Sequence, residues 1–228
     1  MHAFRARGRL ALVAALALAT AAHAAPAPPA AAAERVVVAL GDSLTAGWGV
    51  APEEAWPAQL EARLRAAGFA VRVINAGVSG DTSAGGLARL ESVLRAAPAL
   101  VIVALGANDG LRGVPPETVR ANLTAIVARL QARGVRVLLT GMRVPPNYGP
   151  AYAEAFAAVY ADVARRTGVP LVPFLLEGVA ADPRLNQADG IHPSAAGHRV
   201  IADRLAPTVQ ALVAPGPARP GARAGAGR

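Results

Sequence analysis

The chain has 228 residues, a length that suits one α/β domain and lets it bury a sizeable core without cross-links. It contains no cysteine, which excludes disulfides, thiol catalysis and cysteine-ligated metals. The formal net charge is +8, but six arginines lie close to the two ends, and without them the charge is +2. Since neither a basic stripe nor an aromatic platform is present, nucleic acid is not an expected partner.

The first 24 residues have the pattern of a secretory signal peptide. Three arginines precede an apolar run from Leu10 to Ala22, and Ala22-His23-Ala24 is a small-x-small cleavage site. Residues 25–33 are an Ala/Pro linker, and residues 214–228 are a Pro/Gly-rich tail that we expect to be disordered. The folded domain therefore spans 34–213. We expect a periplasmic or secreted bacterial protein with no stable membrane anchor after cleavage, the alternative being an uncleaved N-terminal anchor.

Strands and helices alternate along the folded segment. Apolar runs predict strands at 35–41, 70–75, 99–105, 135–140 and 169–174. Helical periodicity, glycines and prolines predict helices at about 52–67, 87–97, 117–133, 150–167 and 193–213, the last of which Pro207 could kink or end. This alternation predicts a parallel sheet covered by helices on both faces, because parallel strands need crossover connections.

Ser43 lies two residues after the first predicted strand, at the edge where open α/β sheets bind ligands. A hydroxyl nucleophile needs a base, and His192 lies on a turn three residues after Asp189, which could orient its imidazole. Two of the other histidines lie in the signal peptide, and His198, inside the last helix, is expected to be a surface or packing residue. The alternatives are that Ser43 only begins a turn or caps a helix and that His192 is a capping or core histidine.

Acyl transfer also needs donors for the oxyanion. The backbone N–H groups of Ser43 and Gly80 and the side-chain amide of Asn108 are candidates, since all three follow predicted strands. Gly80 could instead be a turn glycine and Asn108 a turn or cap residue. The glycine-rich loop at 76–86 lacks the patterns of phosphate and dinucleotide cradles.

The sequence resembles a known family at these positions. Gly41-Asp42-Ser43-Leu44, Gly80, Asn108 and Asp189-x-x-His192 resemble the four blocks of the SGNH (GDSL) hydrolases, with most similarity to the branch of periplasmic thioesterase I, lysophospholipase and arylesterase. The resemblance implies a flavodoxin-like three-layer sandwich with a five-stranded parallel sheet. It also implies a catalytic triad of Ser43, Asp189 and His192 with an oxyanion hole from Ser43, Gly80 and Asn108.

The same resemblance implies the substrate and its contacts. The expected partners are small-molecule acyl esters or thioesters, with aryl, short to medium acyl and lysophospholipid substrates in view, and the expected protein is a monomer without cofactor or metal. The residues expected to bind substrate are Asp109, Gly110, Leu111, Val144 and Tyr148, with 110–114 as a mobile loop over the acyl chain. The sequence departs from the branch at Ala107, where glycine is common, and at Val144, where a larger aliphatic residue is familiar.

Other functions stay open at this point. A sugar O-acetylesterase would use the same chemistry. A metal-dependent phosphohydrolase could be built on Asp42, Asp81, Asp109 and His192, although Leu44 stands where the two-aspartate phosphatase loop has its second aspartate. A non-catalytic module could retain the pocket to bind a lipid or a glycan.

Overall fold

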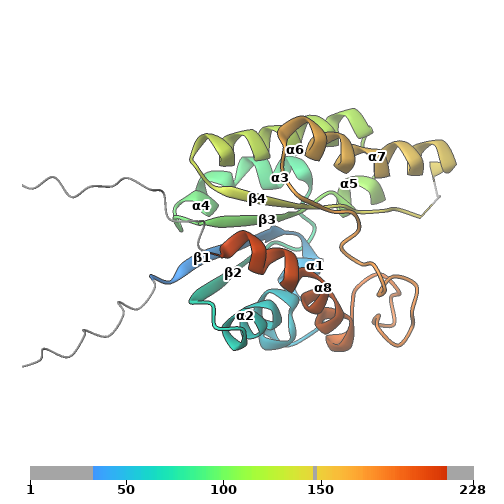
Figure 1. The fold of residues 1–228 in the computed structure, drawn as a ribbon. Coiled ribbons are helices and arrows are strands. Elements are labelled where there is room, and N and C mark those ends of the chain that lie inside the picture. The colour runs from blue at the N-terminus through green and yellow to red at the C-terminus, as the bar shows by residue number, and fades with distance from the viewer. Residues whose placement is uncertain (1–32, 146–147, 215–228) are drawn as a thin grey trace, which may run out of the picture. The chain divides into compact units, whose positions relative to one another are not determined.

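The computed structural model describes residues 33–145 and 148–214, which build an α/β sandwich around one parallel sheet (Figure 1). The predicted signal peptide and almost all of the predicted linker and tail lie outside these residues. The strand order is β2-β1-β3-β4-β5. The strands are β1 (Arg35–Gly41), β2 (Val71–Gly77), β3 (Leu100–Ala104), β4 (Arg136–Thr140) and β5 (Leu171–Val172). All four pairings are parallel, so the predicted five-stranded α/β fold is confirmed.

The two central strands are buried on both faces, which explains their unbroken apolar sequences. Every residue of β3 is buried, and so are the last five of β1. β1 lies between β2 and β3, so the three loops that follow these strands leave neighbouring positions on one edge of the sheet. This is the edge at which doubly wound sheets bind ligands.

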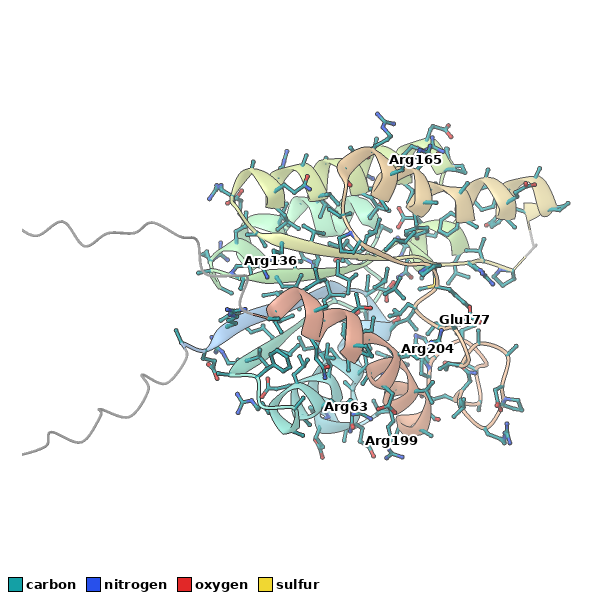
Figure 2. The ribbon with its side chains drawn as sticks, in the orientation of Figure 1. Arg63, Arg136, Arg165, Glu177, Arg199 and Arg204 are labelled. Atoms are coloured by element: carbon teal, nitrogen blue, oxygen red, sulfur yellow. The ribbon has the colours of Figure 1, made fainter. Side chains whose placement is uncertain are left out.

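Helices cover both faces of the sheet (Figure 1). The helical elements are α1 (Ser43–Ala46), the 3₁₀ turn η1 (Pro52–Glu54), α2 (Trp56–Ala66), α3 (Ser83–Ala88), α4 (Leu90–Leu94), α5 (Ala107–Leu111), α6 (Pro116–Ala132), α7 (Pro150–Thr167) and α8 (Ala195–Val213). In Figure 1, α2 and α8 lie on one face, and α3, α6 and α7 lie on the other. Arg63 of α2 pairs with Asp203 of α8 and donates to the carbonyl of Arg199, which joins these two helices (Figure 2).

Two predicted helices are interrupted. Ala55 is extended, with φ −62° and ψ 143°, so the helix predicted at 52–67 is a 3₁₀ turn followed by α2. The helix predicted at 87–97 begins earlier, because the Thr82 side chain accepts the N–H of Gly85 and caps α3. It is then divided at Arg89 into α3 and α4.

Three other boundaries differ from the prediction. The strand predicted at 169–174 is shorter and comprises only the two residues of β5, because the prolines on either side of β5 have no N–H to donate to a neighbouring strand. A short helix, α5, occupies part of the loop expected after 99–105. The last helix continues through Pro207 to Val213, and its inner residues Leu205 and Val209 are buried against the core.

His198 is a residue of α8 that holds the first residue of α2 by a hydrogen bond. Its ring is buried, and Nδ1 accepts the backbone N–H of Trp56 at 3.2 Å. Trp56 is itself fully buried. Burial lowers the pKa of His198 from 6.5 to about 4, so the imidazole is neutral in the folded protein at neutral pH.

We predict that His198 makes the fold acid-sensitive. Between pH 6.5 and about 4 the unfolded chain binds a proton at this ring and the folded chain does not, so stability falls as the pH falls through this window. The loss attributable to His198 is up to about 3 kcal/mol. Urea unfolding from pH 7 to pH 4 measures it. The variant His198→Asn, which keeps an acceptor but does not titrate, should lose correspondingly less, and equal losses in both proteins would contradict the prediction.

Candidate active site

Ser43 is the first residue of α1 and lies two residues after Gly41, the last residue of β1. The Asp42 carboxylate caps this helix by accepting the N–H of Leu44 at 3.0 Å. The backbone N–H groups in the first turn of a helix have no hydrogen-bond acceptor within that helix, so the N–H of Ser43 remains available to another acceptor. The turn passes close to β2, since a Cβ at Gly77 would overlap the backbone of Ala46. The tight strand-to-helix turn therefore presents the Ser43 hydroxyl at the sheet edge.

Ser43, His192 and Asp189 form one chain of hydrogen bonds. Nε2 of His192 lies 2.9 Å from Oγ of Ser43, and Nδ1 lies 2.7 Å from Oδ2 of Asp189. The other oxygen of Asp189 accepts the backbone N–H groups of His192 and Ile191, each at 3.0 Å. These bonds, first of all the one from the His192 backbone, lower the pKa of Asp189 to about 2. The carboxylate is therefore ionised and holds the imidazole toward the serine.

Asp42, beside the serine, has the opposite electrostatic environment. Its side chain is 1% exposed, and this burial raises its pKa from 3.8 to about 6. The N–H of Leu44 and the positive form of His192 both lower the pKa, but by less than burial raises it. Asp42 is thus a buried cap that shapes the serine turn.

Gly80 and Asn108, the expected oxyanion donors, line the same cavity as Ser43 and His192. Gly80 has a φ of +81°, which glycine adopts without strain. The side-chain amide of Asn108 donates to the carbonyl of Asp81 at 2.9 Å, so it is fixed against the loop that carries Gly80. The loops after β1, β2 and β3 thus meet at one small region.

An arginine ties these loops to the first strand. Nε of Arg89 pairs with the carboxylate of Asp81 at 2.6 Å, and Nη2 of the same guanidinium donates to the carbonyl of Gly41 at 2.9 Å. Gly41 is the last residue of β1, two residues before Ser43. One guanidinium therefore spaces the serine turn from the Gly80 loop.

Asp109 was expected to contact substrate, but it lies behind the cavity. Its side chain is 1% exposed, and its carboxylate accepts the backbone N–H of Ser83 at 2.8 Å and the hydroxyl of Ser83 at 2.6 Å. The Ser83 hydroxyl in turn accepts the side-chain amide of Asn122 at 3.0 Å. The residue next to Asn108 therefore clamps α5 to the start of α3.

A cavity of about 550 Å³ opens beside Ser43. Its wall is mostly apolar and includes Leu44, Met142, Phe174 and Leu176. Of the residues expected to bind substrate, Leu111 and Val144 line this cavity. Those two also line an adjoining hollow of about 80 Å³ together with Gly110 and Tyr148.

Sequence reasoning missed several cavity residues. Trp48 follows the serine turn, with its ring centroid 6.3 Å from that of His192. Arg143 lies over the ring of Phe174, with Cζ 5.0 Å from the centroid. Arg143 lies three residues after the strand predicted at 135–140, and Phe174 is the last residue of the strand predicted at 169–174, so their place at the carboxyl ends of strands was the signal that could have identified them.

Comparison with known proteins agrees with this site. Residues 39–200 match the model of the GDSL-like Lipase/Acylhydrolase family. The chain belongs to that family. This GDSL protein is 46% identical to "Esterase TesA" of Pseudomonas aeruginosa over 183 residues, which cover 80% of this chain and 91% of the relative. It is 43% identical to "Thioesterase 1/protease 1/lysophospholipase L1" of Escherichia coli, over 81% of this chain and 87% of the relative.

A solved structure extends the comparison. The psychrotrophic esterase EstA from Pseudoalteromonas sp., in a structure described as inhibited by monoethylphosphonate, superimposes with a TM-score of 0.75. The two sequences are 34% identical, and the match covers 78% of this chain and 98% of EstA. The predicted family resemblance is thereby confirmed.

The residues of the metal-site alternative do not converge in the GDSL protein. Asp81 pairs with Arg89, and Asp109 is turned toward Ser83. Within 33–145 and 148–214, no group of three or more histidine or carboxylate side chains is placed to hold a metal ion. Over the same residues, none of the helices combines the length and apolar character that crossing a membrane requires.

We predict that the clamp around Asp109 is required for stability. In Asp109→Ala the N–H and hydroxyl of Ser83 lose a buried charged acceptor, which should cost about 3 kcal/mol. Asp203→Ala is the matched control, because that carboxylate is 59% exposed and its ion pair with Arg63 is worth less than about 1 kcal/mol. Urea unfolding of both variants tests this, and similar losses would contradict the prediction.

Proposed function

We propose that the protein is a serine hydrolase of small-molecule acyl esters and thioesters that acts through an acyl-serine intermediate. The observation that carries the proposal is the chain of hydrogen bonds from Asp189 through His192 to Ser43 at the wall of an apolar cavity. The names of the relatives, which include an esterase, an arylesterase and a thioesterase, agree with this chemistry.

In the proposed reaction, Nε2 of His192 accepts the proton of the Ser43 hydroxyl while Oγ attacks the carbonyl carbon. The N–H groups of Ser43 and Gly80 and the amide of Asn108 hold the oxyanion of the tetrahedral intermediate. His192 then gives its proton to the leaving alcohol or thiol. Water, deprotonated by the same nitrogen, cleaves the acyl-serine ester and restores Ser43. Asp189 remains ionised throughout, stabilising the imidazolium.

The acyl chain is proposed to lie in the cavity, because its mostly apolar wall favours contact with hydrocarbon over contact with water. Leu111 and Val144 are the proposed contacts for its far part, and the hollow bordered by Gly110 and Tyr148 would extend the available space. We propose no substrate contact for Asp109, because its side chain is buried and hydrogen-bonded to Ser83. Export to the periplasm is proposed on the signal-peptide pattern of residues 1–24 alone.

Ser43→Ala should lower kcat/KM for a p-nitrophenyl ester by about 10³-fold or more, because the nucleophile and its covalent intermediate are lost. Thermal unfolding of the variant should match the wild type, which controls for misfolding. A fluorophosphonate should label the wild-type protein at Ser43 and leave the variant unlabelled. An unchanged hydrolysis rate in a folded Ser43→Ala variant would remove Ser43 from the mechanism.

Val144→Phe should shorten the preferred acyl chain, because the larger ring fills space in both the cavity and the adjoining hollow. We expect the ratio of kcat/KM for a dodecanoyl ester to that for an acetyl ester to fall by about tenfold, the equivalent of one or two excluded methylenes. The acetyl ester is the internal control, since its chain ends near Ser43. A ratio equal to that of the wild type would place the acyl chain elsewhere.

A further inference from the structure

The loop that carries Gly80 is a tight turn that is bonded to the end of β1. The N–H of Asp81 donates to the carbonyl of Val78 at 3.0 Å, and the N–H of Val78 donates to the carbonyl of Gly41 at 3.0 Å. We call residues 78–81 the Gly80 turn. Gly80 occupies its third position, with the positive φ that type II turns have there. The bond that closes the turn uses the N–H of Asp81, so the N–H of Gly80 remains available to an oxyanion.

Arg89 braces the Gly80 turn from the break between α3 and α4. Its Nε pairs with the carboxylate of Asp81 at 2.6 Å, and its Nη2 donates to the carbonyl of Gly41 at 2.9 Å. One guanidinium therefore holds the turn and the end of β1 together. The side chains of Arg89 and Asp81 are only 22% and 10% exposed. Because this charge-assisted pair is largely shielded from water, it is stronger than an ion pair at the surface.

The three donors proposed for the oxyanion are all linked to this guanidinium. Ser43 lies two residues beyond the carbonyl that Arg89 holds, and Gly80 directly precedes Asp81. The side-chain amide of Asn108 donates to the backbone carbonyl of Asp81 at 2.9 Å, which leaves its second N–H for an oxyanion. Neither Arg89 nor Asp81 is among the described residues that line the cavity. Their influence on a reaction there would therefore pass through the donors.

The local packing suits this arrangement and no other cation. A guanidinium directs its Nε and Nη hydrogens along fixed lines, whereas the single ammonium of lysine cannot serve a carboxylate and a separate carbonyl with the same geometry. A Cβ at Gly85 would lie 1.8 Å from Oδ1 of Asp81, so α3 leaves the space that the carboxylate occupies. Arg112 also donates to the carbonyl of Gly80, at 3.1 Å, but that contact is exposed, where water competes for the same groups.

We propose that Arg89 is a positioning residue for the transition state: it sets the spacing between the serine turn and the Gly80 turn and so aligns the three donors on one oxyanion. The inference rests on the proposed function, because it concerns the same site. A displacement of about 1 Å in a reacting geometry can cost about 10²-fold in rate. The carbonyl of a bound substrate carries much less charge than the oxyanion, so substrate binding should depend far less on Arg89 than the rate does.

Arg89→Lys tests the proposal, and Arg63→Lys is its matched control. Arg63 is also 22% exposed, pairs through Nε with a carboxylate and donates through Nη2 to a backbone carbonyl, but it joins α2 to α8 (Figure 2). The measurement is kcat and KM for p-nitrophenyl butyrate. We expect Arg89→Lys to lower kcat by about tenfold or more with KM within about twofold of the wild-type value, and Arg63→Lys to leave both unchanged.

Two inhibitors separate the oxyanion donors from the rest of the site. Oγ of Ser43 adds to the carbonyl carbon of an alkyl trifluoromethyl ketone, its proton passes to His192, and the ketone oxygen becomes an oxyanion. A primary alcohol of the same chain length fills the cavity and forms no such adduct. In Arg89→Lys the Ki of the ketone should rise about tenfold, in parallel with the loss of kcat, and the Ki of the alcohol should remain that of the wild type.

Asp81→Ala tests the same contact from the other partner. It removes the carboxylate that Arg89 holds and keeps the backbone carbonyl that accepts the amide of Asn108. We expect the same selective result, a fall in kcat of about tenfold and a weaker ketone with an unchanged alcohol. Circular dichroism verifies the fold of each variant, and Asp81→Ala carries the test if Arg89→Lys does not fold.

Three results would overturn the proposal. A wild-type kcat in folded Arg89→Lys would show that the donors do not depend on this guanidinium. Equal losses of kcat in Arg89→Lys and Arg63→Lys would reveal a general effect of destabilisation. Ketone and alcohol inhibition that weaken together would show that the cavity, and not the set of donors, has changed. Failure of the proposed function is distinct from all three, because Ser43→Ala would then hydrolyse the ester and bind the ketone as the wild type does.

Discussion

The hydrogen bond between Nε2 of His192 and Oγ of Ser43, at 2.9 Å, joins residues that are 149 positions apart in the chain. Neither residue is brought to the other by its own local structure: Ser43 begins a four-residue helix, and His192 lies on the connection before α8. Only the parallel sheet brings them together, because it places the connections from all five strands at one edge. Chemistry at this edge therefore depends on the register of the central strands.

Buried and partly buried polar contacts hold the loops around the serine. Asp42 caps the serine turn, Arg89 links the carbonyl of Gly41 to Asp81, and Asp109 holds Ser83. Such contacts fix a geometry that apolar packing alone would leave loose, and each is costly to break because its groups are shielded from water. The cavity contributes the opposite property, an apolar surface that binds without fixing a single orientation. A rigid polar site beside an adaptable apolar space suits a reaction that is constant in its chemistry and variable in its acyl chain.

The local pattern of apolar residues predicted the strands and helices that pack into the hydrophobic core. The buried run at 35–41 coincides with β1, and the helix predicted at 150–167 coincides with α7, because burial on two faces and a clear helical stripe leave strong signals. Two local features were missed, the short helix α5 and the break at Ala55, and both adjoin hydrogen bonds from distant segments, Asp109 to Ser83 and Trp56 to His198. Asp109 illustrates the same limit within the site. The family resemblance implied a substrate contact for Asp109, whereas its partner Ser83, 26 residues away, determines the direction of its side chain.

Convergence of these loops on one reacting centre can be seen in a crystal structure of the protein after reaction with an alkyl fluorophosphonate. We expect phosphorus bonded to Oγ of Ser43, with one phosphonyl oxygen about 3 Å from the N–H groups of Ser43 and Gly80 and from the amide nitrogen of Asn108. The alkyl group should point into the cavity lined by Leu111 and Val144. Phosphorus bound to another side chain, or a phosphonyl oxygen directed into solvent away from all three donors, would contradict this arrangement of the active site.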